Sequence, residues 1–302
     1  AYLFTGPKGV GKRTLAIRLA QALNCPEASP PGTPCLECRT CSLIERMQHP
    51  DLAVVQSEHE GGTLKVDQIR SLQHDLSLSP YEALYRIAVL LRFEEASTSA
   101  ANAMLKTLEE PPPQVIIIIT AESCEQLLPT IVSRCEVLRL RPLAANEVSL
   151  SLSKKWDLPT EQANLLAHIS GGRLGYALRL QNEPELLDNR NKWLNDLQRM
   201  ISASHVERFD YAEILAKDKN TLIEVLQVWL SFWRDVLIVS MDTSLQLTNL
   251  DQENEIKYLA NKINVNKTHQ FVFRIEQTIV LLGRNVNTRM ATEVLLLDLP
   301  RT

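Results

Sequence analysis

The sequence predicts a chain with two parts of different class, an α/β part followed by an all-α part. Short, nearly continuous apolar runs alternate with helical patterns in residues 1–143, and such runs suit parallel strands that are covered on both faces. A glycine-rich segment joins the first run to the first helical pattern, and after Pro142 all patterns are helical. The predicted fold class is therefore a doubly wound, five-stranded parallel sheet with helices on both faces, followed by helical domains.

Each predicted strand is a short apolar run rich in β-branched residues or leucine. The strands are expected at 2–4 (YLF), 52–55 (LAVV), 86–91 (RIAVLL), 115–120 (VIIIIT) and 135–140 (CEVLRL). The helices between them are expected at 12–23, 66–77 and 100–110. Pro111 to Pro113 end the last of these helices, because proline cannot donate a helix hydrogen bond.

Three domains are expected along the chain. Residues 1–143 form the α/β core, residues 144–183 a small helical lid, and residues 184–302 a helical C-terminal domain. Within the lid, the glycine-rich turn SGGRLG at 170–175 precedes the last helix.

The composition argues against two classes of protein, those that coat nucleic acid and those that span a membrane. The 302 residues carry a net charge of −4, which argues against a protein whose main task is to coat nucleic acid. The first twenty residues nevertheless carry four basic side chains and no acid, so a local basic patch is allowed. The most hydrophobic helical segment, 221–240, contains Glu224, Arg234 and Asp235, which favours a buried helix over a membrane span. We expect a cytoplasmic protein without a membrane partner, and we expect residues before the first one, which is not Met.

The segment GPKGVGKRT (6–14) nearly matches the phosphate-binding pattern G-x-x-x-x-G-K-[ST], whose final hydroxyl ligates Mg²⁺. Phosphate binding is predicted through the loop residues and the start of the next helix, namely Gly6, Gly9, Gly11, Lys12, Arg13 and Thr14. The hydroxyl position, however, holds Arg13, and a guanidinium has no acceptor for a cation. Thr14 follows one position too late. We expect weak or absent ATP binding, in which Arg13 contributes charge toward phosphate while it excludes the metal.

Hydrolysis also needs acidic residues at the end of a neighbouring strand. The strand RIAVLL ends in Leu91 and Arg92 instead, and Glu94 and Glu95 follow too late. A shifted arrangement that uses Glu94 stays open, while the plainer interpretation of both glutamates is a solvated turn. The arginine at the hydroxyl position and the missing acids at the strand end both predict that this site does not hydrolyse ATP.

Four of the six cysteines lie in one stretch, CPEASPPGTPCLECRTC. The spacing of Cys25, Cys35, Cys38 and Cys41 is that of a tetrahedral Zn²⁺ site with four thiolates, and such a closed site is structural. The alternatives are unrelated buried cysteines or a redox role. The zinc module, at about 25–41, is expected as an insertion between the first helix and the second strand. Cys124 and Cys135 are expected in the core.

The string SAANAMLKTLEEPPP (99–113), followed by LLPTIVSRC (127–135), closely resembles the clamp-loader branch of the AAA+ ATPases. The four-cysteine insertion is typical of the bacterial subunits. The resemblance covers the core strongly, the lid moderately, and the C-terminal domain mainly through NVNTRMATEVLLLDL (285–299). It implies a P-loop AAA+ core, and a C-terminal collar domain that packs into a ring of homologous subunits.

The resemblance allows two types of bacterial subunit. One is the tau/gamma motor, and the other is the delta-prime type, which has the same fold but does not hydrolyse ATP. The resemblance implies three features for a motor. Its phosphate loop would end in GKT or GKS, the strand that corresponds to 86–91 would end in a pair of acidic residues, and the lid would carry an arginine. The chain has GKR and LR, and Gly175 stands at the lid position, with Arg173 two residues early. These departures favour the delta-prime type. The alternative is a divergent motor in which Glu94 and Thr14 replace the missing metal ligands. A third interpretation, a stand-alone DNA-binding ATPase, is disfavoured by the negative net charge of the chain.

The resemblance also implies a catalytic role in trans for the SRC motif, Ser133, Arg134 and Cys135. In this family the arginine of the motif contacts the γ-phosphate of ATP bound to a neighbouring subunit. The alternative is an arginine paired within its own domain. The implied partners are the tau/gamma motor subunits and the delta subunit, and through the complex the sliding clamp and primed DNA. The chain would thus be part of a DNA polymerase III holoenzyme without enzymatic activity of its own.

Overall fold

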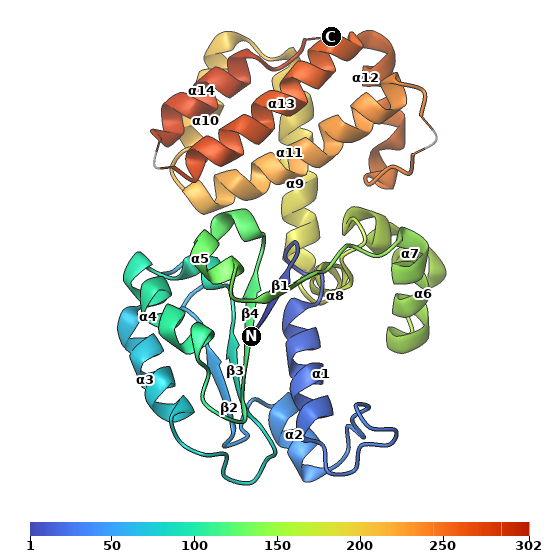
Figure 1. Ribbon diagram of the computed structural model, residues 1–302. Coiled ribbons are helices and arrows are strands. Elements are labelled where there is room, and N and C mark those ends of the chain that lie inside the picture. Colours follow the sequence, from blue (N-terminus) through green and yellow to red (C-terminus); the bar gives the residue numbers. More distant parts are fainter. Residues whose placement is uncertain (244, 285, 302) are drawn as a thin grey trace. The chain divides into compact units, whose positions relative to one another are not determined.

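The computed structural model describes residues 1–243, 245–284 and 286–301, which form two compact units. The first unit consists of residues 1–143 and 173–175, and the second of residues 144–172 and of the described residues from Tyr176 onward. Figure 1 shows the helices and strands of both units. The division into core, lid and collar domains stays a prediction.

The first unit is built on a five-stranded parallel sheet, as predicted. Its strand order is β2-β3-β4-β1-β5, so β2 and β5 form the two edges. The strands are β1 (Tyr2–Thr5), β2 (Leu52–Val55), β3 (Arg86–Leu90), β4 (Val115–Ala121) and β5 (Glu136–Arg139). The connecting helices are α1 (Lys12–Asn24), α2 (Arg39–Glu45), α3 (Val66–Leu76), α4 (Thr98–Glu109) and the short α5 (Pro129–Val132), with 3₁₀ turns at Phe93–Glu95 and Cys124–Gln126.

Both faces of this sheet are buried, because successive strand residues point to opposite sides. Leu90 and its register partner Ile119 face one core cluster, together with Met104 of α4 and residues of α3. Ile118 faces the other cluster, together with Ala16 of α1 and Ile44 of α2. Helices therefore cover both faces, with α3 and α4 on one side and α1 and α2 on the other (Figure 1).

The second unit is helical throughout its described secondary structure. Its helices are α6 (Ala145–Trp156), α7 (Thr160–Ile169), α8 (Leu174–Asn182), α9 (Pro184–Ser202), α10 (His205–Leu215), α11 (Lys219–Ser240), α12 (Glu253–Lys262), α13 (Val265–Leu282) and α14 (Thr288–Leu297), with a 3₁₀ turn at Leu250–Gln252. The first two residues of α8 belong to the first unit.

The long helix α11 lies at the centre of the core of the second unit. Trp229 and Trp233 are fully buried there, and Trp233 meets Phe271 of α13 edge-to-face, with ring centroids 5.1 Å apart. Among the described residues, no helix is both long and apolar enough to cross a membrane.

Candidate functional site

The loop between β1 and α1 has the backbone of a phosphate-binding loop. Gly9 and Gly11 have φ angles of 79° and 105°, a region that favours glycine, and Gly11 directly precedes the first helical residue. Backbone N–H groups at the start of a helix attract anions, and the helix dipole adds to this attraction. The backbone thus fits the predicted phosphate site.

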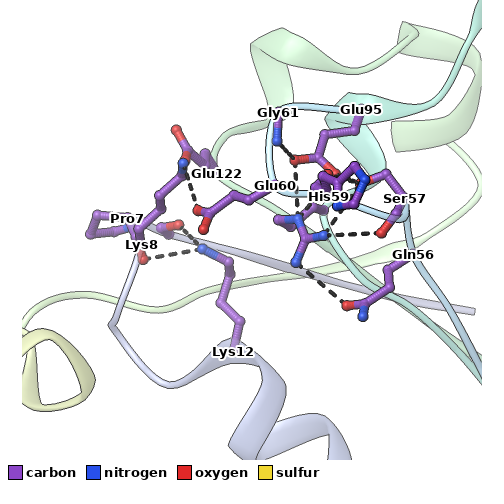
Figure 2. Close-up of polar contacts among 12 residues, drawn as sticks. Pro7, Lys8, Lys12, Gln56, Ser57, His59, Glu60, Gly61, Glu95 and Glu122 are labelled. Atoms are coloured by element: carbon purple, nitrogen blue, oxygen red, sulfur yellow. Dashed lines mark hydrogen bonds and ion pairs between the residues drawn. The ribbon is translucent and has the colours of Figure 1, made fainter. Parts of the chain in front are cut away.

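The Lys12 side chain, in contrast, is engaged by the loop itself. Its Nζ donates hydrogen bonds to Gly6 O and, at 3.1 Å, to Pro7 O (Figure 2). Burial lowers the pKa of Lys12, against the opposing charges of Glu122 and Glu94. The ammonium group that would reach the phosphates is therefore bound to the carbonyls of its own loop.

Arg13 and Thr14 lie to another side of α1. The Arg13 Nη2 donates to Met47 Sδ at 3.2 Å. Both residues line a small cavity of about 270 Å³, together with Ile17, Arg18 and Glu45. Thr14 thus lies at the cavity beside Glu45, and nothing in this arrangement replaces the missing hydroxyl ligand at position 13.

An arginine fills the end of β3, where a motor would carry its acidic pair. The Arg92 backbone lies in the left-handed region, with φ of 51°, and its N–H donates to Thr120 Oγ1 at 3.0 Å. The Arg92 Nε lies 3.0 Å from both carboxylate oxygens of Glu95. A permanent cation therefore occupies the neighbourhood in which a second metal ligand would be needed.

Glu95 joins this arginine to the loop after β2. Its carboxylate accepts hydrogen bonds from Gly61 N, at 2.8 Å, and from Ser57 Oγ (Figure 2). Arg92 also contacts Ser57 Oγ, at 3.3 Å. The ion pair and its hydrogen bonds form one network that fixes the loop at 57–61.

The expectation of a solvated turn at Glu94 and Glu95 is wrong. Phe93 is buried, and the 3₁₀ turn that it anchors leaves both carboxylates only partly exposed. Glu94 Oε2 has no hydrogen-bond partner among the described residues. Burial raises the pKa of Glu94, and the nearby Glu122 adds to this effect while Lys12 opposes it.

Three further contacts hold the phosphate loop in place. Lys8 Nζ lies 2.9 Å from Glu60 Oε1 and 3.7 Å from Glu122 Oε1 (Figure 2). Gly175, at the position expected for a lid arginine, donates its N–H to Gly9 O at 2.9 Å. A Cβ at Gly175 would lie 2.8 Å from that oxygen, so the contact requires glycine and provides no cationic side chain.

Arg134 lies between α5 and the edge strand β5, and its side chain is 31% exposed. It pairs with Glu109, the last residue of α4, which is the pairing within its own domain that the alternative interpretation expects. Of the two other residues of the motif, Ser133 Oγ donates to Thr130 O at 3.2 Å. Cys135 packs against the core, and burial raises its pKa. Cys124 also packs partly buried against this core.

Sequence reasoning missed Glu109 and Glu95 as parts of the site. Glu109 belongs to the string LEEPPP that carries the resemblance, and this was the available signal. The sequence indicates only a turn at Glu95, because its partners Ser57 and Gly61 lie in a loop distant in the sequence.

The four cysteines Cys25, Cys35, Cys38 and Cys41 form one cluster whose sulfur atoms all lie within 4.8 Å of one another. Cys25 Sγ is 3.6 Å from Cys35 Sγ and 3.9 Å from Cys38 Sγ. All four are free thiols. Tetrahedral coordination with bonds of about 2.3 Å would place the sulfur atoms about 3.8 Å apart, so the cluster could hold a metal ion.

The electrostatics of the cluster also fit a cation. Backbone N–H groups of Cys35, Cys38 and Cys41 donate to the sulfur atoms of Cys25, Cys35 and Cys38 at 3.3–3.5 Å. Against the effect of burial, such bonds lower the pKa of Cys25 to about 7. Burial and the neighbouring thiols raise the pKa of Cys41 to about 12. Four thiolates at this distance repel one another, and a divalent cation at the centre removes that repulsion.

The comparison with family models gives two matches. A model described as "DNA polymerase III, delta subunit" matches residues 1–144, and one described as "DNA polymerase III, delta subunit, C terminal" matches residues 184–300. The two matches do not overlap and together cover most of the chain.

Individual relatives agree with these models. The chain is 29% identical to "DNA polymerase III subunit delta'" of Bacillus subtilis, over 99% of this chain and 90% of that protein. It is 35% identical to the subunit of the same name of Pseudomonas aeruginosa, over 61% of this chain and 56% of that protein. It is also 31% identical to "DNA polymerase III subunit tau" of Bacillus subtilis, over 61% of this chain and 33% of that protein. Taken with the two family models, these matches establish that the chain belongs to the DNA polymerase III delta-prime family.

Proposed function

We propose that the chain is a subunit of a clamp loader, the complex that uses ATP to load a sliding clamp onto primed DNA. Its relatives are DNA polymerase III subunits of the delta-prime and tau types, which supports a place in such a complex. Its direct partners would be the tau/gamma motor subunits and the delta subunit, in the cytoplasm. It would reach the clamp and the DNA through the assembled complex.

The chain does not hydrolyse ATP by itself under this proposal. Support comes from two arginines at positions where a motor would hold its metal ligands: Arg13 at the hydroxyl position, and Arg92 paired with Glu95 at the end of β3. Lys12 is bound to loop carbonyls, and Gly175 offers no side chain to a γ-phosphate. Any ATP held by Gly6, Gly9 and Gly11 would be bound weakly and without turnover.

The contribution to catalysis comes from Arg134, which acts in trans as an arginine finger. The observation that carries this proposal is a contrast within one unit. The chain's own phosphate site is filled by internal contacts, while Arg134 is partly exposed at the β5 edge of the sheet. A rigid, permanently charged guanidinium stabilises the charge on a transferring phosphoryl group, and can be worth roughly 10³–10⁵ in rate.

Reconstitution with the motor and delta subunits tests this function. Arg134→Ala should slow the DNA- and clamp-stimulated ATP hydrolysis and the clamp loading of the complex, because the adjacent motor site loses its finger. The variant should retain its fold, its metal content and its place in the complex, which are checked by circular dichroism, elemental analysis and native mass spectrometry. Wild-type hydrolysis and loading by a fully assembled Arg134→Ala complex would refute the role in trans.

The alternative of a divergent motor that uses Glu94 and Thr14 has weaker support. Thr14 lines the cavity beside Glu45. The pair of Arg92 with Glu95 occupies the end of β3, and Glu94 lies between these two residues in the chain.

The cysteine cluster is proposed to hold one structural Zn²⁺. Four thiolate ligands leave no open coordination position, so the ion would stabilise the insertion and perform no chemistry. Support comes from the spacing of the four sulfur atoms and from the N–H groups directed at them.

A further inference from the structure

The guanidinium of Arg134 is held by a side chain from another element. Glu109, at the end of α4, accepts a hydrogen bond from Arg134 Nε at 2.7 Å and a second one from Nη2. On the other side of the guanidinium, Nη1 donates to Thr130 O at 2.7 Å. Three short hydrogen bonds to two acceptors on different sides therefore fix the plane of the group.

These contacts leave part of the guanidinium for another acceptor. Arginine carries five N–H donors, and strong acceptors engage three of them here. The remaining two belong to Nη1 and Nη2, and their only described contact, from Nη1 to Ser133 Oγ, is long at 3.4 Å. With the side chain 31% exposed, these donors are available to an oxygen anion outside this unit.

The place of Glu109 suits a rigid support. It is the last residue of α4, and Glu110 and the three prolines at 111–113 follow it directly. Proline restricts the backbone, so the end of the helix has little freedom. A partly exposed ion pair of this kind contributes little to folding stability, but it removes the rotational freedom of a long side chain before a ligand arrives.

We propose that Glu109 is a positioning residue that orients Arg134 toward the phosphate of the neighbouring subunit's ATP. The inference rests on the proposed role of Arg134 in trans. Glu109 does not contact the nucleotide; it keeps the guanidinium in a fixed orientation so that no reorganisation is needed when the charge develops. A small displacement of a group that contacts the reacting atoms can cost about a hundredfold in rate.

The test compares variants of this chain in the fully assembled complex, with clamp and primed DNA present. Glu109→Ala should reproduce most of the loss of ATP hydrolysis that Arg134→Ala causes. The loss should lie in the maximal rate, while the ATP concentration for half-maximal rate stays unchanged. Glu109→Gln keeps one acceptor oxygen and the shape of the side chain, so its loss should be smaller. Glu110→Ala, which removes the adjacent carboxylate, is the matched control and should behave as wild type.

The double variant Glu109→Ala/Arg134→Ala makes the test specific. If Glu109 acts through Arg134, the double variant should hydrolyse ATP at the rate of Arg134→Ala alone. An additional loss in the double variant would contradict the inference, as would a wild-type or raised rate of Glu109→Ala in a complex that Arg134→Ala impairs. A wild-type rate of Arg134→Ala would instead remove the proposed function on which the inference rests.

Discussion

Arginine replaces a metal ligand at two positions around the phosphate loop. Arg13 takes the place of the hydroxyl that would bind Mg²⁺, and Arg92 fills the end of β3 through its pair with Glu95. A guanidinium offers no acceptor to a cation, so each of the two positions lacks a metal ligand independently of the other. The loss of hydrolysis therefore has two separate causes within one site.

We predict that Arg13→Thr does not restore ATP hydrolysis to the isolated chain. The new hydroxyl could ligate Mg²⁺, but Arg92 would still occupy the end of β3. The measurement is magnesium-dependent phosphate release, with Arg13→Thr/Lys12→Ala as the background control. Robust turnover by Arg13→Thr that this control lacks would show that the Arg92 network does not block the site.

At the scale of elements, the boundaries of strands and helices follow local chemistry and were largely predictable. The strand at 52–55 has the predicted bounds, whereas β3 ends at Leu90, because the chain turns into the left-handed region at Arg92. The helix expected from residue 100 begins at Thr98, because Ser97 Oγ caps it by accepting the N–H of Ala100 at 3.2 Å.

The candidate site was predictable only where its residues are close in the sequence. The loop from Gly6 to Thr14 and the four cysteines have ligand spacings that are local patterns. The pairs Arg92–Ser57 and Arg134–Glu109 join residues far apart in the chain, and no local pattern encodes them. Their positions depend on strand order and on the packing of helix ends.

Metal removal should loosen one element first. A chelator strong enough to extract one zinc ion per chain should increase amide hydrogen exchange in residues 25–45, while β1, β3 and β4 keep their protection, because metal binding stabilises only the fold around its ligands. Zinc release should become easier as the pH falls, since the ligands must be thiolates. Cys35→Ser should lose the metal, and Cys124→Ser, outside the cluster, is the control. Substoichiometric zinc with four freely titrating thiols in unchelated protein would contradict this prediction.

A buried arginine joins two helix ends in the second unit. Arg208 is 1% exposed and donates to Met200 O, Ile201 O, Leu296 O and Leu299 O at distances of 2.8–3.1 Å. These carbonyls lie near the C-termini of α9 and α14, where helix dipoles favour a cation.

Arg208→Met should therefore lower the free energy of unfolding of this unit by about 3 kcal/mol or more, since it leaves buried carbonyls without donors. Tryptophan fluorescence during urea unfolding provides the measurement, because Trp156, Trp193, Trp229 and Trp233 all lie in this unit. The control is Arg274→Met, which removes an exposed pair with Asp298 and should cost less than about 1 kcal/mol. Equal effects of both variants would show that the buried contacts add no stability.

At the scale of the whole molecule, the chain contains two compact units with separate hydrophobic cores. A delta-subunit family model matches the first, and the C-terminal model matches most of the second. Within the first unit, the phosphate loop follows β1 and Arg134 precedes the neighbouring edge strand β5. The side chain of Lys12 is bound to carbonyls of its own loop, whereas the guanidinium of Arg134 keeps donors available to an external anion. This asymmetry is the central claim of the proposed function.

The most direct test replaces each of these two groups in turn in the reconstituted complex. Lys12→Ala should leave the clamp- and DNA-stimulated ATP hydrolysis of the complex close to the wild-type rate, because the chain's own site performs no turnover. Arg134→Ala should remove the part of that hydrolysis that the adjacent motor site contributes. A strong loss with Lys12→Ala together with a wild-type rate for Arg134→Ala would contradict the account.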